Sequence, residues 1–392
     1  MLRSRNQKEG PPVFSHEFVI QNHADIISCV CMVVFMGLIP QFTNPLASSI
    51  IFVQYNKTLE LEVDESDGPT LRLDNKPLPQ TFYQHGWRDL LNIVFYSFVW
   101  VIIHALLQEY IWEKTAKRLR LSKLKLSKYY DSGSLVVFYL VSVVWGIDHI
   151  IKAGYLLSPQ SLWEQYPHTD MPLSLKFYML TQMAFWLHCY PELYFMKTKK
   201  EKIYSKIVLY TSSLLMIGGA YFMQLQRLAL VLLVLHYSVE FLFHACRLLH
   251  YYGKDDIAIS GFNLWRLLFI AVRIVTVLIS VVTLWFGLGM VNRELARQKA
   301  EAPPIDEEEG MVNESADPPI DFTELPYRLS GLGFIVILQL WIGWTFINYQ
   351  MIRSSATGTE GANGTAAPPK LTKGSAKTGK SPKASSSKPK QS

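Results

Sequence analysis

Long apolar stretches alternate with polar connectors along the chain, and this pattern predicts a membrane protein. An apolar helix needs about 20 residues to cross the ~30 Å hydrocarbon core of a bilayer, and most of the stretches approach or exceed that length. Lipid offers the backbone no hydrogen-bond partners, so a spanning segment of this length forms a helix. We therefore predict an all-α polytopic membrane protein with eight transmembrane helices, at roughly 26–48, 91–111, 134–151, 173–195, 207–222, 228–249, 264–290 and 329–352.

The connectors alternate between basic and acidic, and this alternation predicts the orientation of the helices. Lysine and arginine dominate residues 114–128 and 197–206, after the second and fourth stretches. Acidic residues dominate residues 60–74, after the first stretch, and residues 306–309, after the seventh. Because basic residues that flank membrane helices stay on the cytosolic side, both termini are expected in the cytosol.

Three glycosylation sequons bear on the same topology. Asn56 begins Asn-Lys-Thr and Asn313 begins Asn-Glu-Ser, and both lie in connectors predicted to be lumenal. We expect carbohydrate at these two positions. The sequon at Asn363 falls in the predicted cytosolic tail and should stay unmodified.

The pattern divides the chain into five regions. Residues 1–25 form a polar cytosolic arm, and because no cleavable signal peptide is visible there, the first helix is expected to act as the targeting signal. Residues 26–111 hold the first two helices and a lumenal loop. Residues 112–327 hold helices three to seven, and residues 328–352 hold the eighth. Residues 353–392 contain almost nothing apolar and are predicted to be a disordered basic tail.

The composition indicates a class of partner and gives no sign of a disulfide framework. The net charge of +6 is concentrated in segments predicted to be cytosolic, including seven lysines between Lys370 and Lys390. Such a tail suits contact with phosphate, either of ribosomal RNA or of anionic lipid, although it can also serve only as a solubilising tail. The four cysteines all lie inside apolar stretches and are interpreted as core residues.

Ionisable residues inside the predicted helices are the candidate functional residues. His236, Glu240 and His244 recur every four positions and therefore share one face of the sixth helix. His188 and Glu192 flank the region of Pro191 in the fourth helix. Charges in lipid are costly and often mark function. We interpret the group either as a polar seam whose hydrogen bonds are satisfied by neighbouring helices or as a metal-binding or proton-relay site.

Arg273 completes this seam in the seventh helix. At ~1.5 Å per residue, Glu240 and Arg273 lie about 13 and 15 Å from the same end of two consecutive helices. Consecutive antiparallel helices usually pack as neighbours. We therefore hypothesise a buried Glu240–Arg273 ion pair.

Several strings resemble the translocating chain-associated membrane protein family of the endoplasmic reticulum. They include SHEFVIQNHAD at 15–25, IIHA at 102–105, SLWEQYPH at 161–168, WLHCYPELYF at 186–195 and HYSVEFLFH at 236–244. The resemblance implies a multi-pass protein of the endoplasmic-reticulum membrane, beside the Sec translocon. It would contact nascent secretory and membrane polypeptides and assist their translocation or insertion. Membrane lipids would be further partners, and neither an enzymatic activity nor a cofactor is implied.

Residues 112–327 also resemble the wider TLC domain, which includes the ceramide synthases. This resemblance implies an alternative, a lipid-handling protein that binds, transfers or synthesises sphingolipid- or acyl-CoA-related molecules. Ceramide synthases carry a His-His pair where this chain has Leu209 and Tyr210, and acidic residues where it has Tyr237, Glu240 and His244. Leucine and tyrosine cannot supply a general base at neutral pH, so we expect no enzyme. A transporter is a further alternative, disfavoured because paired broken helices are missing.

Overall fold

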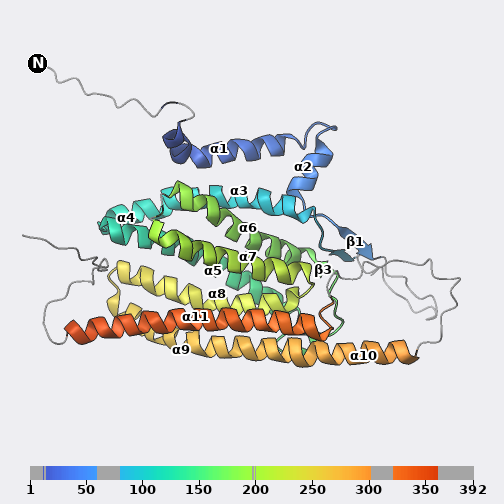
Figure 1. Ribbon diagram of the computed structural model, residues 1–392. Coiled ribbons are helices and arrows are strands. Elements are labelled where there is room, and N and C mark those ends of the chain that lie inside the picture. Colours follow the sequence, from blue (N-terminus) through green and yellow to red (C-terminus); the bar gives the residue numbers. More distant parts are fainter. Residues whose placement is uncertain are drawn as a thin grey trace, which may run out of the picture. The chain divides into compact units, whose positions relative to one another are not determined.

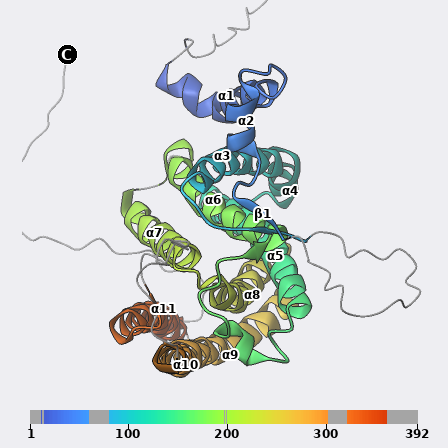
Figure 2. The same ribbon diagram turned by 90° about the vertical axis from the view of Figure 1, so that its right-hand side faces the viewer.

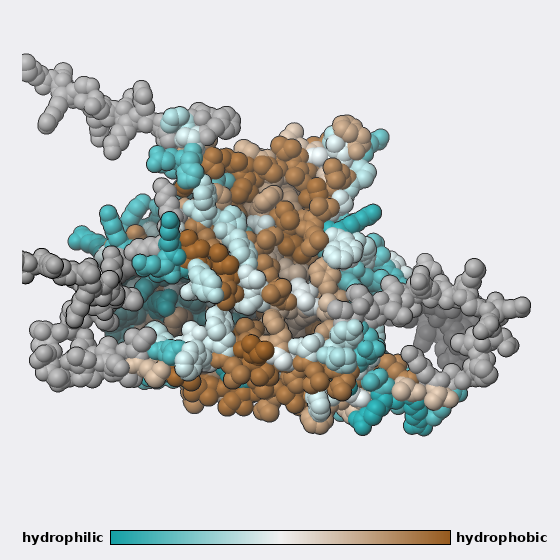
Figure 3. All heavy atoms as spheres, viewed as in Figure 1, coloured by the Kyte–Doolittle hydropathy of each residue, from teal (hydrophilic) through white to brown (hydrophobic). Residues whose placement is uncertain are grey.

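Seven helical segments of the computed structural model are, among the described residues, long and apolar enough to cross a membrane. The structure describes residues 12, 15–59, 80–196, 198, 200–301 and 321–360. The helices between residues 16 and 301 run side by side as a bundle (Figure 1). On the face seen in Figure 3, hydrophobic side chains gather over the middle of the helices and hydrophilic ones toward their ends. The prediction of an all-α polytopic membrane protein is confirmed.

The first half of the chain folds into helices with well-defined ends. The Ser15 side chain accepts a hydrogen bond from Phe18 N at 3.2 Å and caps the first helix. Gly154, with φ of +70°, follows the end of the longest helix in this half. The elements are α1 (His16–Met36), α2 (Asn44–Ile51), α3 (Asp89–Leu107), the π-helix η1 (Gln108–Glu113), α4 (Lys114–Leu119), α5 (Lys123–Lys152) and the 3₁₀ turn η2 (Pro159–Leu162).

The second half continues the bundle and ends on a long helix. Gly253, with φ of +72°, lies in the turn between two of its helices. The elements are α6 (Leu173–Phe195), α7 (Lys200–Phe222), α8 (Gln226–Tyr251), α9 (Asp255–Ser280), the π-helix η3 (Val281–Gly287), α10 (Leu288–Glu301) and α11 (Leu325–Glu360). Residues up to Ile337 form one compact unit, and those from Leu338 form a second.

A small sheet interrupts the all-α architecture at one end of the bundle, which the sequence analysis did not predict. It is antiparallel, in the order β1 (Asn56–Leu59), β2 (Gln80–Tyr83), β3 (Met171–Pro172). Strands of two to four residues carry too little alternation to be recognised in a sequence. The sheet and the connection between α4 and α5 lie at opposite ends of the helices (Figure 1).

The eight predicted helices correspond to α1, α3, α5, α6, α7, α8, α9 and α11, but α6 is not among the seven segments that meet the criterion of length and apolarity. The count of eight therefore stays a prediction. The predicted first helix, 26–48, is corrected: α1 begins at His16 and ends at Met36, and a separate α2 follows. Pro40 lies in the break, where a proline cannot continue the hydrogen-bond ladder.

Three other predicted regions change at their edges. Ten residues of the predicted polar arm, 16–25, are helical because α1 begins there. The helix that contains the predicted seventh span continues past residue 290, since α10 ends at Glu301. Helix α11 extends to Glu360, into the predicted tail. The rest of that tail, the acidic residues 306–309 and Asn313 lie outside the described residues.

The core of the larger unit is built around α6 and α8. Helix α8 packs against α5, α7 and α9, and α6 packs against α3 and α7 (Figure 2). Fourteen of the 23 residues of α6 are buried, and 13 of the 26 of α8. The helices approach closely where small residues allow it: a Cβ on Gly146 of α5 would overlap the Val234 side chain of α8. The residues of the predicted polar seam, except Arg273 of α9, therefore fall on the two most buried helices.

Candidate functional site

The predicted polar seam is distributed over three helix interfaces. His188 and Glu192 lie on α6 and face α3, where they meet His104, a residue outside the predicted seam. His104 Nδ1 lies 3.1 Å from Glu192 Oε1, and the His104 and His188 rings are 5.9 Å apart. His188 Nδ1 contacts the carbonyl oxygen of Phe185. Glu192 Oε2 accepts no hydrogen bond from the described residues.

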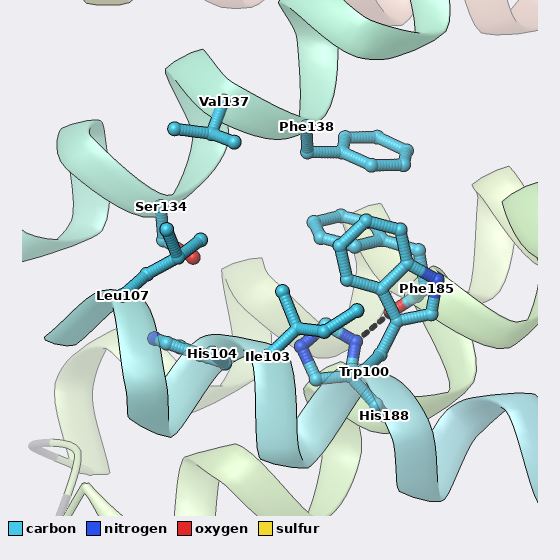
Figure 4. A pocket seen from close by; sticks show the side chains of 9 residues that line it. All are labelled: Trp100, Ile103, His104, Leu107, Ser134, Val137, Phe138, Phe185 and His188. Carbon is cyan, nitrogen blue, oxygen red and sulfur yellow. Dashed lines mark hydrogen bonds between the residues drawn. The ribbon is translucent and has the colours of Figure 1, made fainter.

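A cleft between α3, α5 and α6 opens beside these two histidines (Figure 4). It is a small hollow, with room for about one water molecule. One wall is a stacked pair of rings, Phe138 and Phe185, with centroids 3.4 Å apart. The remaining wall is apolar apart from Ser134 and the two imidazoles. The lining residues are Trp100, Ile103, His104, Leu107, Ser134, Val137, Phe138, Phe185 and His188.

His244 belongs to a second interface, between α8 and α5. Its Nδ1 lies 3.2 Å from Oγ of Ser132, a serine with no exposed surface. Arg247 Nη1, one turn further along α8, also donates to that oxygen at 3.3 Å. The guanidinium of Arg247 lies 4.4 Å from the Phe243 ring centroid. This group bonds between helices and lines no described cleft.

His236 and Arg273 form the third interface, between α8 and α9. Arg273 Nη2 lies 2.8 Å from His236 Nδ1, and its guanidinium lies 4.8 Å from the Phe269 ring centroid. Glu240 lies one helical turn from His236 on α8. The two helices are neighbours, as the hypothesised Glu240–Arg273 pair requires. The pairing of these two charges stays a prediction.

An aromatic cluster fills the space between the first two interfaces. Trp186 Nε1 donates to the Tyr237 hydroxyl at 3.0 Å. The Tyr210 ring packs 5.9 Å from Trp186, and the Tyr139 ring lies 5.1 Å from Tyr237. Tyr210 and Tyr237 are two of the residues that the resemblance to ceramide synthases singled out, and a third, Leu209, is 37% exposed. Phenols and an indole supply packing and hydrogen bonds there, and no general base near neutral pH.

The sequence analysis missed a buried ion pair beside the sheet. Lys176 Nζ of α6 lies 2.9 Å from Asp89 Oδ1 at the start of α3, and neither side chain has exposed surface. The ammonium also donates to the carbonyl oxygens of Gln54, at 2.9 Å, and Gln84, at 2.5 Å. Asp89 Oδ2 accepts from the Tyr221 hydroxyl of α7 at 2.8 Å and from Gly86 N at 2.9 Å. Five segments of the chain therefore converge on one pair of charges.

One charged residue near the start of each of two apolar stretches was the available signal for this pair. Asp89 precedes the second predicted helix by two residues, and Lys176 follows the start of the fourth by three. Residues in such positions are usually at the membrane interface and solvated. Their full burial depends on the sheet, which covers this end of the bundle.

His168, in the connector from α5 to α6, is a buried histidine outside the membrane helices. Its two ring nitrogens lie 3.2 Å from the carbonyl oxygen of Gln224 and 3.0 Å from that of Glu164. Burial, and secondarily the positive charge of Arg227, lower the pKa of His168 to about 4. The imidazole is therefore neutral at physiological pH, and it ties the connector to the turn between α7 and α8.

The remaining candidates give two further results. Among the described residues, no three His, Cys, Asp or Glu side chains are grouped so that they could hold a metal ion. Asn56, the first residue of β1, is exposed on an edge strand of the sheet. Its modification stays a prediction, and so does that of Asn313.

Comparison with known proteins places this architecture in a class. Residues 128–348 match the family model of the TLC domain, so the chain is a TLC-domain membrane protein. Human Translocating chain-associated membrane protein 2 is 40% identical over 347 residues, which is 88% of this chain and 84% of that protein. The mouse protein of the same name is 38% identical over the same length and coverage. Mouse Ceramide synthase 4 is 33% identical over 115 residues, 29% of each chain.

The chain belongs to the translocating chain-associated membrane protein family. The resemblance read from its sequence motifs is therefore confirmed. The likeness to ceramide synthase covers only part of the chain and keeps a lipid-related function as an alternative.

Proposed function

We propose that the protein is a non-enzymatic accessory of the endoplasmic-reticulum translocon that contacts nascent polypeptides beside the channel. The cleft between α3, α5 and α6 carries this proposal. Its lining combines an aromatic and aliphatic wall with the imidazoles of His104 and His188. The apolar rim of the cleft can pack against an apolar segment, and the two imidazoles can bond a polar side chain that enters it.

In the proposed mechanism, contact with the cleft lowers the free energy of an imperfectly hydrophobic client segment in the lipid bilayer. A charged or strongly polar residue at the centre of a membrane helix is unfavourable by about 2.5–3.5 kcal/mol on insertion scales. The imidazoles of His104 and His188, which line the cleft, can form a hydrogen bond with such a residue of a client. A hydrogen bond between membrane helices is worth about 0.6 kcal/mol on average, so the expected help is small per contact and selective for marginal clients.

This proposal includes the location and orientation read from the sequence. The protein would be a multi-pass protein of the endoplasmic-reticulum membrane, with both termini cytosolic and Asn56 in the lumen. The Sec channel and nascent secretory and membrane chains would be its partners. The position of Asn56 and of residues 114–128 at opposite ends of the bundle supports this arrangement (Figure 1).

Photocrosslinking in intact microsomes tests the site directly. A photoreactive residue at Leu107, which lines the cleft, should form adducts with a stalled nascent chain that carries a weakly hydrophobic signal anchor. The same probe at Leu106, its neighbour on α3 and 50% exposed, is the matched control. Equal adducts from the two positions would indicate random collision in the membrane.

Reconstitution of depleted microsomes with wild-type or variant protein tests the activity in membrane insertion. His104→Gln and His188→Gln, which change the two imidazoles of the cleft, should lower insertion of weakly hydrophobic anchors and leave strongly hydrophobic anchors unchanged. His236→Gln, at an interface that lines no described cleft, is the control. Insertion that is the same with wild type, variants and no added protein would rule out the accessory role.

The alternative is a lipid-handling protein, and the TLC-domain match and the ceramide synthase likeness favour it. The apolar cleft would then hold part of a lipid. Lipid adducts from the Leu107 probe, in place of nascent-chain adducts, would support this alternative. An enzymatic function would further require a catalytic group that the aromatic cluster of Trp186, Tyr210 and Tyr237 does not supply.

A further inference from the structure

A helical hairpin made of α4 and the start of α5 carries seven basic residues and packs around a small hydrophobic core that includes Leu248 of α8. Trp112, Ala116 and Tyr129 are buried in this core, and Tyr129 has no exposed surface. A Cβ on Gly133 would lie 2.6 Å from the Trp112 ring, so glycine permits this close packing. Arg120, with φ of +49°, makes the turn between the two helices.

All seven cations of this hairpin are exposed. Apolar residues between them, Ala116, Leu119 and Leu121, are buried or half-buried and belong to the core of the hairpin. The sequence from Lys114 to Lys128 contains no carboxylate, and Glu113, directly before it, places Oε2 3.7 Å from Lys117 Nζ. We refer to the exposed set as the basic platform: Lys114, Lys117, Arg118, Arg120, Lys123, Lys125 and Lys128.

The basic platform stands above the lipid headgroups. The apolar run of α3 ends at Ile111, and that of α5 begins at Leu135. At ~1.5 Å per residue, Arg118 and Lys128 lie about 10 Å outside the hydrocarbon and Lys123 about 18 Å. The headgroup layer is only about 5–7 Å thick on each side. Every member except Lys114 therefore lies beyond that layer.

We propose that the basic platform binds the phosphate backbone of structured RNA on the cytosolic side of the membrane. Exposed cations on two rigid helices lose little further entropy when they meet a fixed array of phosphates, and the released counterions favour binding. Two arginines among the seven can hold phosphate oxygens with paired hydrogen bonds. The proposal needs the predicted cytosolic orientation, but it needs neither a client nor the translocation channel.

Height and rigidity favour RNA over anionic lipid. The attraction of a membrane surface falls off within a Debye length, about 8 Å at physiological salt. The outermost cations of the platform lie further than this from the headgroups. A helix fixed by the Trp112 and Tyr129 packing cannot fold down onto the membrane.

Binding of full-length protein in phosphatidylcholine nanodiscs to a short RNA duplex, and to large ribosomal subunits without nascent chain, tests this proposal. The variant carries Lys117→Gln, Arg118→Gln, Lys123→Gln and Lys125→Gln. Its affinity should fall at least about tenfold at physiological salt. The slope of log Kd against log salt should decrease by about three to four, roughly one for each phosphate that the variant no longer neutralises.

The matched control changes the same number of charges in the C-terminal region, with Lys373→Gln, Lys377→Gln, Lys380→Gln and Lys383→Gln. It should change the slope by less than about one. Equal effects of both variants would show attraction by net charge alone and overturn the proposal, as would unchanged binding by the platform variant. A platform variant that loses only its preference for phosphatidylserine nanodiscs would assign the surface to lipid. Lys125→Glu with Lys128→Glu provides a second variant if the first does not fold.

Discussion

Helices α6 and α7 follow one another and have the same length, yet they occupy opposite environments. Fourteen of the 23 residues of α6 are buried, against two of the 23 of α7, Ile217 and Tyr221. The largely uncharged part of α7 is long and apolar enough to meet the criterion for a membrane helix, whereas polar residues spaced along α6 keep it from meeting that criterion. The helix with polar residues spaced along its length is therefore the central one.

The two helices also satisfy their polar groups differently. In α6, Lys176 reaches Asp89, Gln182 accepts from Ser142 at 3.2 Å, and Glu192 meets His104. In α7, Ser212 and Ser213 each donate to the Leu209 carbonyl oxygen at 2.9 Å within the same helix. A helix whose polar groups need partners on other helices is drawn inside the bundle, because lipid offers none. Because Ser212 and Ser213 satisfy their hydroxyls within the helix, this part of α7 can face lipid.

The largest expected effect on stability comes from removing the charge at the start of α6. Lys176→Met should destabilise the protein by about 3–5 kcal/mol, because it leaves Asp89 as a buried unpaired charge. Lys206→Met on α7, which removes a partly exposed lysine 3.3 Å from Asp131, should have an effect of about 0–1 kcal/mol. The midpoint of unfolding by sodium dodecyl sulfate, in mild detergent, measures both.

The double variant Asp89→Asn with Lys176→Met separates pairing from packing. It should be milder than Lys176→Met alone, because no charge remains buried. Additive destabilisation would show that the two residues contribute independently and would contradict the pairing.

Acidification tests the contact of His168, in the connector from α5 to α6, with the turn between α7 and α8. The folded pKa of His168 is about 4, below the ordinary value of about 6.5. Below pH 6.5 the unfolded chain therefore binds a proton that the folded chain does not. Stability should fall by up to about 1.4 kcal/mol per pH unit between pH 6.5 and 4.

His168→Gln should remove this part of the acid dependence. Thermal unfolding midpoints measured across the pH range compare the variant with wild type. Parallel profiles for the two proteins would mean that His168 becomes protonated without loss of folded structure.

A smaller difference is expected from uncharged groups. Gln182→Leu removes a hydrogen bond between α6 and α5 and should destabilise by about 0.6 kcal/mol, the average for such bonds between membrane helices. Ser212→Ala on α7 removes only a bond within its own helix and should be close to neutral. The same detergent titration compares them, and a larger destabilisation by Ser212→Ala would reverse the proposed distinction.

The orientation of α6 and α7 in the membrane can be tested with a substitution that has no expected effect on stability. Asn56→Gln should abolish one glycan, seen as a mobility shift after enzymatic deglycosylation, because the exposed Asn56 begins an edge strand at the end of the bundle where α6 starts. Modification at Asn363 in the natively inserted protein would place the tail in the lumen and invert the topology.

The periodic alternation of apolar runs and charged connectors determined the class of fold and the approximate positions of the helices. It did so because a bilayer imposes a minimum apolar length and a closed backbone hydrogen-bond system on every spanning segment. Motifs such as WLHCYPELYF also identified the family without a structure. Helix ends were less predictable: α1 begins ten residues before its apolar run because polar residues can continue a helix beyond the hydrocarbon.

Only the tertiary structure decided which ionisable residues meet. His188, Glu192, His236, Glu240 and His244 recur at helical spacing, but the structure distributes them over different interfaces and adds His104 from α3. The Asp89–Lys176 pair joins positions 87 residues apart and is enclosed by a sheet of very short strands. Spacing along one helix fixes the face on which a residue lies, whereas its partner depends on which helix covers that face. That choice follows from packing between segments distant in the chain, which a single sequence does not reveal.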